Sequence, residues 1–299
     1  MDKILEVLTK KGPLTGKELL RELPGDEFSL WVACRRSEDV VSRIVGRRYL
    51  RLDIQVEDYA RLSPSIMREF FGYTLLGTRS QAGEMARRAE ELREELARTS
   101  RKKFELARKV MGQLVEEHEE AERINHGAAF MIAGDVVYGM AHGEPRPESS
   151  TGELVKGSDL DIIVVTEGLP LEVTASLDAA IYREKHRLLM NPALREEIDS
   201  IVKDTGRVRK QLEFQDFKSM VASKILLEAE FLWGSRDLFD RVKEMLAQKG
   251  IPERIRALEE KAALDREAAE AYLLKAPPDL PRDEAMKLFH TAEEKEEIF

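Results

Sequence analysis

The segment at residues 156–165, KGSDLDIIVV, constrains the fold of this chain more than any other. A β-branched run that lies between Gly157 and Gly168 predicts a short buried strand rather than a helix. Alternate residues of a strand point to the same side, so Asp159 and Asp161 would project together, about 6.6 Å apart. The sequence therefore places two like charges on one face at the start of a buried strand.

Length and composition predict a multidomain protein with no membrane partner. At 299 residues the chain exceeds a typical single domain, so two or three domains are expected. No apolar run approaches the roughly 20 residues that cross a bilayer, and the amphipathic start lacks a signal-peptide apolar region. The single cysteine, Cys34, excludes an intrachain disulfide, and the five scattered histidines offer no zinc spacing. We expect a cytoplasmic protein.

The first third of the sequence predicts short helices followed by a strand. Thr15 and Glu18 have the spacing of a capping box at the start of the second helix. A third helix is expected through residues 28–46, and residues 47–56 alternate as a half-buried strand does. The inner side of the third helix would comprise Trp31, Cys34, Val40, Val41 and Ile44.

This order of elements resembles a winged helix-turn-helix domain over about the first 75 residues. The resemblance implies that arginines around the third helix contact nucleic acid, phosphates first. These arginines are Arg35, Arg36, Arg43 and Arg47. The net charge of −9 argues against general coating of nucleic acid but not against such a local contact. The alternative is a packing or dimerisation module whose arginines pair with Glu38, Asp39 and Asp53.

Residues 80–122 contain no proline and are rich in Ala, Glu, Arg and Leu. A narrow apolar stripe among closely spaced opposite charges predicts one or two long solvated helices. The stripe consists of Leu92, Leu96, Leu106, Val110, Leu114 and Val115. Such helices connect domains and are candidates for a homodimer interface.

The two aspartates suggest a metal site. Without a partner they would repel each other, and one would tend to stay protonated. A divalent cation removes this penalty, and hard carboxylate oxygens suit Mg²⁺ or Mn²⁺. Such a metal can orient a triphosphate, neutralise its charge and help to deprotonate a hydroxyl.

The motif GSDLDIIVV resembles the signature of the DNA polymerase β-like nucleotidyltransferase superfamily. The resemblance covers roughly residues 125–205. It implies that Asp159 and Asp161 bind metal and that the turn after the preceding strand, at Gly134, holds the nucleotide phosphates. Asp135 stands where the family has serine. The nucleotide-binding residues that the resemblance implies are Gly134, Asp135, Gly157 and Ser158.

The family also has a third carboxylate on a later strand, and the resemblance implies that the three acids together bind two metal ions, the third acid holding the one near the attacking oxygen. Asp199, within the β-forming segment REEIDSIVKD, is the first choice, and Glu197 and Asp204 are alternatives. Residues 214–246 and 251–275 predict further helices, and a short helix is expected at the end of the chain. Basic candidates for the phosphates are Lys156, Arg207, Arg209, Lys210, Lys218 and Lys224, although solvation is the favoured role of Lys218 and Lys224.

The sequence thus predicts an α+β chain with four parts. They are a winged-helix-like domain (1–78), a helical connector (79–124), a nucleotidyltransferase-like mixed-sheet core (125–212) and a helical region (213–299). The expected activity is Mg²⁺-dependent transfer of a nucleoside monophosphate from an NTP to a hydroxyl acceptor. One alternative is an inactive nucleotide-binding protein that acts as a DNA-binding regulator. Another is an assembly module in which the acids are incidental.

Overall fold

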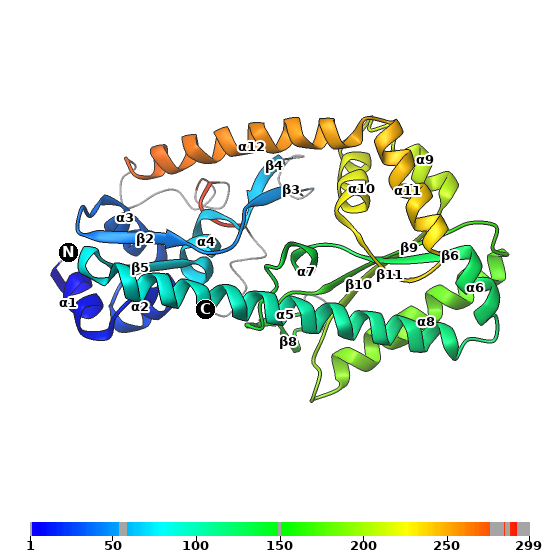
Figure 1. Ribbon diagram of the computed structural model, residues 1–299, viewed down its shortest axis with the longest axis horizontal. Helices are drawn as coiled ribbons and strands as arrows, with labels where there is room; N and C mark the ends of the chain where they lie inside the picture. The colour runs from blue at the N-terminus through cyan, green and yellow to red at the C-terminus, as the bar shows by residue number, and fades with distance from the viewer. Residues whose placement is uncertain (1, 54–58, 149–150, 276–283, 285–287, 292–299) are drawn as a thin grey trace. The chain divides into compact units, whose positions relative to one another are not determined.

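The computed structural model describes residues 2–53, 59–148, 151–275, 284 and 288–291, and it is an α+β structure (Figure 1). The chain divides into two compact units. The first comprises Met1–Arg51, Ala60–Glu95 and Leu258–Phe299, and the second comprises Leu52–Tyr59 and Leu96–Ala257. Two long helices, α5 (Ala82–Glu116) and α12 (Ile251–Leu273), contribute residues to both units. Among the described residues, no helix is long and apolar enough to span a membrane.

The first unit contains four helices before α5 and a small antiparallel sheet. The helices are α1 (Asp2–Lys11), α2 (Gly16–Glu22), α3 (Glu27–Arg36) and α4 (Ile66–Tyr73). The sheet has the order β1-β5-β2, from β1 (Leu14–Thr15), β5 (Thr74–Thr78) and β2 (Val40–Ile44). Two further strands, β3 (Tyr49–Asp53) and β4 (Tyr59–Ser63), pair with each other, and a 3-10 turn, η1 (Arg79–Gln81), precedes α5.

The capping box predicted for the second helix is confirmed. The Thr15 hydroxyl accepts a hydrogen bond from the Glu18 amide at 3.2 Å, and the Glu18 carboxylate accepts one from the Thr15 amide at 2.7 Å. These two bonds satisfy backbone donors that the first turn of a helix leaves without partners.

The prediction of one helix through residues 28–46 is wrong in its second half. Helix α3 ends at Arg36, and the following residues form β2, which pairs antiparallel with β5. The β-branched residues of this segment favour a strand once a partner strand is present. Val41 and Ile44 are 36% and 46% exposed, whereas Trp31 and Cys34 are buried as expected.

The core of the first unit includes residues from the end of the chain. The ring of Phe289 lies 5.5 Å from that of Trp31 and 5.3 Å from that of Phe28, between centroids. The backbone of Phe289 also accepts a hydrogen bond from the Met67 amide at 2.9 Å. The terminal helix expected from the sequence lies mostly outside the described residues.

The second unit is built on a four-stranded mixed sheet with the order β10-β9-β6-β11. Strand β9 (Leu160–Thr166) runs parallel to β10 (Ile198–Asp204) and antiparallel to β6 (Ala128–Ile132), which pairs antiparallel with β11 (Glu230–Gly234). The polar stretch before β9 contains a hairpin of β7 (Pro145–Pro147) and β8 (Leu154–Lys156). The helices are α6 (Ala121–Gly127), α7 (Asp135–Tyr138), α8 (Leu171–Met190), α9 (Thr205–Gln211), α10 (Phe217–Glu228) and α11 (Arg236–Gln248).

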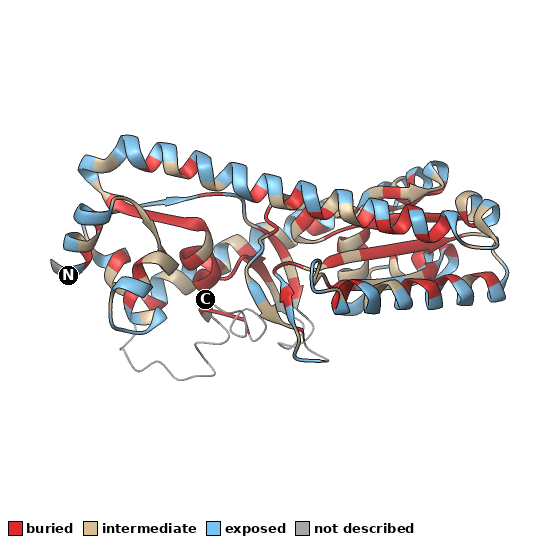
Figure 2. Cartoon of the chain, turned by 90° about the horizontal axis from the view of Figure 1, so that it is seen from below, coloured by how far each residue is buried: buried red, intermediate tan, exposed pale blue. Residues whose placement is uncertain are grey.

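Alternate residues of β9 face opposite sides of this sheet. Leu160, Ile162 and Val164 join one hydrophobic cluster with residues of α5 and α8. Strands β6 and β9 are almost wholly buried, and Figure 2 shows buried strand residues between helices that are exposed on their outer sides. Asp161 belongs to the other alternate set, so the predicted strand and the predicted side of the aspartate both follow from its period of two.

Residues 214–246 do not form the uninterrupted helical region that was predicted, because β11 separates α10 from α11. Gly234 ends this strand with φ of 85°, and a Cβ there would lie 2.3 Å from the carbonyl oxygen of Ala128. A glycine is therefore required where β11 leaves β6. The local sequence favours helix on both sides, and only the partner strand selects the extended form.

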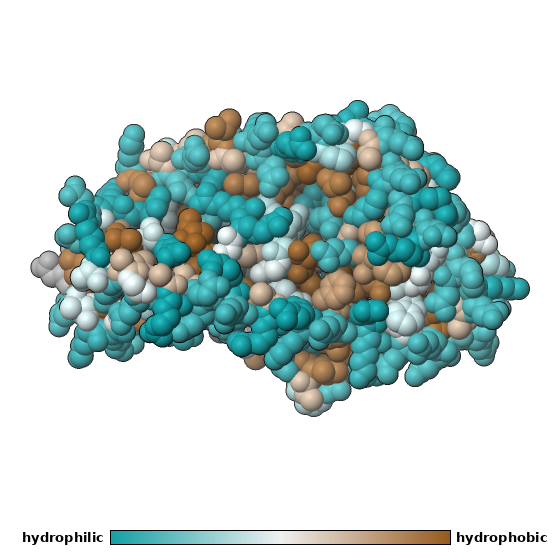
Figure 3. All heavy atoms as spheres, in the orientation of Figure 1, coloured by the Kyte–Doolittle hydropathy of each residue, from teal (hydrophilic) through white to brown (hydrophobic). Residues whose placement is uncertain are grey.

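The prediction of long solvated helices is confirmed. Helix α5 is continuous, with its apolar stripe inward at Leu96, Val110 and Val115. Helix α12 carries isolated exposed apolar residues such as Leu264, which is 67% exposed. On the face seen in Figure 3, hydrophilic residues dominate the surface around scattered hydrophobic ones.

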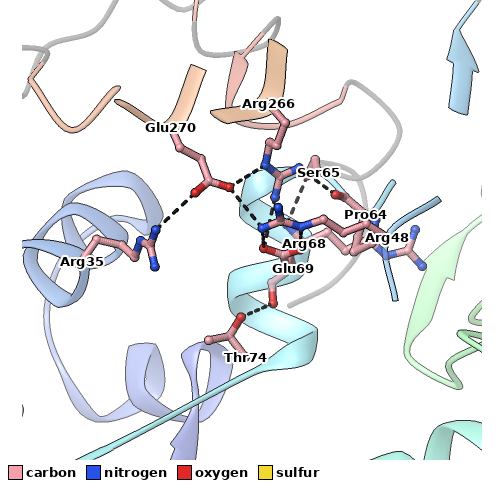
Figure 4. A network of polar contacts seen from close by, with 9 residues as sticks. All are labelled: Arg35, Arg48, Pro64, Ser65, Arg68, Glu69, Thr74, Arg266 and Glu270. Carbon is pink, nitrogen blue, oxygen red and sulfur yellow. Dashed lines mark hydrogen bonds and ion pairs between the residues drawn. The ribbon is translucent and has the colours of Figure 1, made fainter. Parts of the chain in front are cut away.

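Within the first unit, ion pairs and hydrogen bonds between arginines and glutamates connect α12 to α4 (Figure 4). Glu69 is paired with Arg48 at 2.5 Å and with Arg266 at 3.3 Å, and its side chain is 7% exposed. Arg266 also bonds to Glu270 at 2.8 Å and to the carbonyl of Pro64 at 2.9 Å. The buried charges of Glu69 and Arg266 therefore have charged partners, without which their burial would be costly.

We predict that Arg266→Met destabilises the first unit by about 3 kcal/mol, because it leaves buried Glu69 with one cationic partner fewer. The measurement is denaturant unfolding followed by Trp31 fluorescence in a Trp233→Phe background. Arg87→Met, which removes an exposed pair with Glu91, is the control and should cost less than about 0.5 kcal/mol. Equal costs for the two variants would contradict a stabilising role of the network.

Candidate functional site

The structure brings together most of the acids that the sequence singled out. Asp161 and Asp199 are register partners on the adjacent parallel strands β9 and β10. Neighbouring residues in register share a sheet face, so both carboxylates start from the same side. Asp159 precedes β9 by one residue, and its charge acts on both Asp161 and Asp199. The three predicted catalytic acids therefore form one acidic cluster.

Gly134 forms a sharp turn directly after β6, beside this cluster. The preceding amide, of Ala133, donates to the carbonyl of Asp161 at 3.0 Å. Gly134 has φ of 70°, and a Cβ at this position would lie 2.0 Å from Oδ2 of Asp161. Only glycine permits both this backbone conformation and this close approach of the carboxylate.

Asp135 accepts a hydrogen bond from Ser158, the serine of the GSDLDIIVV segment. The Ser158 hydroxyl donates to Oδ2 of Asp135 at 2.8 Å and accepts from the amide of His142 at 3.3 Å. Gly157, with φ of 61°, passes so close to His142 that a Cβ would lie 1.9 Å from its carbonyl oxygen. The four residues predicted to bind nucleotide thus lie in two adjoining turns, 134–142 and 157–158.

Arg146 is a cation of this site that sequence reasoning missed. Its guanidinium lies 3.7 Å from the Asp159 carboxylate and 2.9 Å from that of Glu197, and its Nε donates to the carbonyl of Gly157 at 2.9 Å. Glu197, an alternative third acid, is therefore occupied by Arg146. Arg146 lies in the β7–β8 hairpin. No local sequence pattern predicts that this hairpin packs against residues 157–159.

Glu228, the last residue of α10, was also missed. Its carboxylate accepts a hydrogen bond from the amide of Gly134 at 3.3 Å and from the Tyr138 hydroxyl at 2.5 Å. It also forms an ion pair with Lys224, one turn earlier in the same helix. The signal was a Lys and a Glu at i, i+4 spacing in the mostly apolar second half of the helix. Lys224 is only 9% exposed, so the favoured solvated role was wrong.

The remaining candidates lie elsewhere. Asp204 is at the other end of β10, in register with Thr166, and caps α9 by accepting the Arg207 amide at 2.7 Å. Strand rise puts it about 17 Å along the sheet from Asp199. Arg207, Arg209 and Lys210 lie on that distant helix. Lys156 bonds to the carbonyl of Ala193 at 2.6 Å.

The arginines predicted to contact nucleic acid do not share one helix. Arg35 and Arg36 end α3, where Arg35 pairs with Glu270 at 3.2 Å and Arg36 donates to the carbonyl of Leu274. Arg43 lies on β2 and is exposed, and Arg47 follows that strand. The third helix therefore presents fewer basic groups than the sequence implied.

Electrostatics at the acidic cluster penalise ionisation. Burial raises the pKa of Asp161 well above its usual value, and the charges of Asp159, Asp199, Asp135 and Glu228 raise it further. Burial and then Asp159 also raise the pKa of Asp199, while Lys185 lowers it. Like charges gathered at a partly buried point favour protonation or a bound cation.

Carboxylate oxygens have the right chemistry for Mg²⁺ or Mn²⁺, whose ligands are hard. Within the described residues, however, no group of three His, Cys, Asp or Glu side chains is arranged to hold a metal ion. Mg²⁺ is commonly held by one or two carboxylates together with substrate phosphates. The acids of this site therefore have the chemistry of magnesium ligands, but within the described residues they do not form a complete ligand set.

Comparison of the chain with protein-family models and with curated proteins gave no match. The functional reading of the site accordingly depends on its own chemistry.

We predict that Asp161→Asn stabilises the metal-free protein, and more so at pH 8 than at pH 5. The folded state raises the pKa of Asp161, so the stability from its protonated form is present at acidic pH. This stability is lost as pH rises through the folded-state pKa, and asparagine avoids the loss. The measurement is urea unfolding in EDTA, with Asp178→Asn, on the exposed side of α8, as the control. A benefit that does not grow with pH would contradict the prediction.

Proposed function

We propose that the second unit is a metal-dependent nucleotidyltransferase, which moves a nucleoside monophosphate from an NTP to a hydroxyl acceptor. The observation that carries this proposal is the register of Asp161 with Asp199 on parallel strands, with Asp159 just before β9 and the Gly134 turn beside it. A nucleotidyltransferase-like core is the fold that this proposal assigns to the sheet, with a winged-helix-like domain in the first unit.

In the proposed reaction the acceptor oxygen attacks the α-phosphorus, and the bond from that phosphorus to the bridging oxygen breaks. Pyrophosphate leaves, and the hydroxyl proton passes to a carboxylate of the site. Asp199 suits this role because it is exposed and its pKa is raised. Asp159 and Asp161 would hold Mg²⁺, which when bound neutralises triphosphate charge.

The second candidate function is a nucleotide-binding protein without transferase activity that regulates through nucleic acid. It is favoured by Asp135, whose negative charge stands where the family has a neutral hydroxyl. Ser158 holds that carboxylate in place at 2.8 Å. An extra acid beside a triphosphate opposes binding unless a cation lies between them.

We predict that Asp161→Asn lowers nucleotidyl transfer by at least about a hundredfold, because the charge that develops in the transition state loses its stabilisation. The assay is transfer of label from each α-labelled NTP to protein, RNA or small molecules of a cell extract. Asp159→Asn and Asp199→Asn are expected to behave similarly, and Asp178→Asn should retain full activity.

Equal transfer by wild type and Asp161→Asn would contradict the mechanism. If wild type transfers nothing with any NTP, Asp135→Ser tests whether the replaced serine is the cause. Transfer restored by Asp135→Ser would favour the inactive regulator, and continued inactivity would count against a transferase ancestry of the site.

For the first unit we predict that duplex DNA or RNA binds and that log Kd changes linearly with log salt, because bound arginines release phosphate counterions. Arg43→Ser with Arg47→Ser should weaken binding about tenfold or more and reduce the salt slope by about two. Fluorescence anisotropy measures both quantities. Arg87→Ser, on the exposed side of α5, is the control. Absence of binding at low salt would leave the unit as a packing module.

A further inference from the structure

Glu228 is a nearly buried carboxylate, with a side chain 7% exposed, at the edge of the acidic cluster. It accepts hydrogen bonds from the Gly134 amide at 3.3 Å and the Tyr138 hydroxyl at 2.5 Å. The ammonium group of Lys224 pairs with it and lies 5.2 Å from the centre of the Tyr138 ring. Three donors from two segments of the chain therefore converge on a single anion.

An ionised carboxylate at position 228 is electrostatically unfavourable. Glu228 adds to the negative charges that raise the pKa of Asp161, so the folded protein bears repulsion that a neutral side chain would avoid. Its donors are a backbone amide, a hydroxyl and an ammonium group. These are the groups that bind phosphate oxygens in proteins, because each donates to a negatively charged acceptor.

We propose that Glu228 is an internal anion in the subsite for a phosphate group of the nucleoside triphosphate, and that the triphosphate displaces it from Gly134, Tyr138 and Lys224. The inference rests on the proposed function, because it assigns a phosphate to the turn beside Asp161. It adds Tyr138 and Lys224 as phosphate-binding residues. It also makes Glu228 a competing anion that lowers the affinity for the nucleotide.

The surroundings of Glu228 permit the exchange. Lys243 donates to the carbonyls of Leu226 and Leu227 at 2.8 and 2.7 Å, which anchors the end of α10 independently of Glu228. In the proposed exchange Glu228 changes rotamer and releases its three donors, while the contacts of Lys243 keep the end of α10 in place. A phosphate group carries more negative charge than a carboxylate and brings its own Mg²⁺, which also relieves the repulsion at Asp161.

The test is calorimetric binding of Mg²⁺–tripolyphosphate, and of each Mg²⁺–NTP, to the full chain. Glu228→Gln keeps the shape of the side chain but removes the competing charge, so Kd for tripolyphosphate should fall about tenfold. Lys224→Met should raise Kd about tenfold, and Tyr138→Phe should raise it by a smaller factor. Glu230→Gln, an exposed glutamate at the start of β11, is the matched control and should leave Kd unchanged. Thermal unfolding verifies that each variant is folded.

A Kd for Glu228→Gln that is unchanged or higher than that of wild type overturns the inference, as does absence of tripolyphosphate binding by both. Tighter binding of NTPs but not of tripolyphosphate also overturns it, because the subsite would then recognise another part of the nucleotide. The outcome is independent of catalysis. If Glu228→Gln binds tripolyphosphate more tightly but no label is transferred, the transferase proposal fails and the displacement of Glu228 stands. If label is transferred but Glu228→Gln does not change Kd, the transferase proposal stands and the displacement of Glu228 fails.

Discussion

The buried charge of Asp161 is the constraint on which the organisation of the second unit depends. Its strand must be buried for the sheet to pack, because Leu160, Ile162 and Val164 lie in one continuous core. The alternate side of the same strand then carries a carboxylate beside other acids. A chain that needed only a stable strand would place an apolar residue there. Burial and the neighbouring acids instead raise the pKa of Asp161 well above its usual value, which is the electrostatic basis of the cation-binding role that we propose for it.

Two cations beside the cluster, Arg146 and Lys224, are paired with carboxylates that are not among Asp159, Asp161 and Asp199. Arg146 lies between Glu197 and Asp159, and Lys224 is paired with Glu228. This arrangement reduces the net charge of the site while no ligand is present.

Local patterns in the sequence predicted the elements whose cause is local. The β-branched run of β9, the capping box of Thr15 and the narrow stripe of α5 each depend on neighbours within a few residues. Strands β2 and β11 were assigned to helices because their pairing partners are distant in sequence, β5 and β6. Strand preference depends strongly on such partners, whereas helix preference is mainly local.

Some residues of the candidate site could likewise be predicted from local sequence, whereas others could not. Asp159 and Asp161 were evident from spacing, and Asp199 from its β-forming neighbours, because each lies within a strand pattern. Arg146 and Glu228 reach the site from a hairpin and from the end of a helix, and only the tertiary fold places them there. The side chains of Arg146 and Glu228 lie around the three central aspartates and are not part of that cluster. A sequence motif can therefore locate the centre of such a site, but the groups that tune its charge, and with it the affinity for an anionic ligand, follow only from the packing around it.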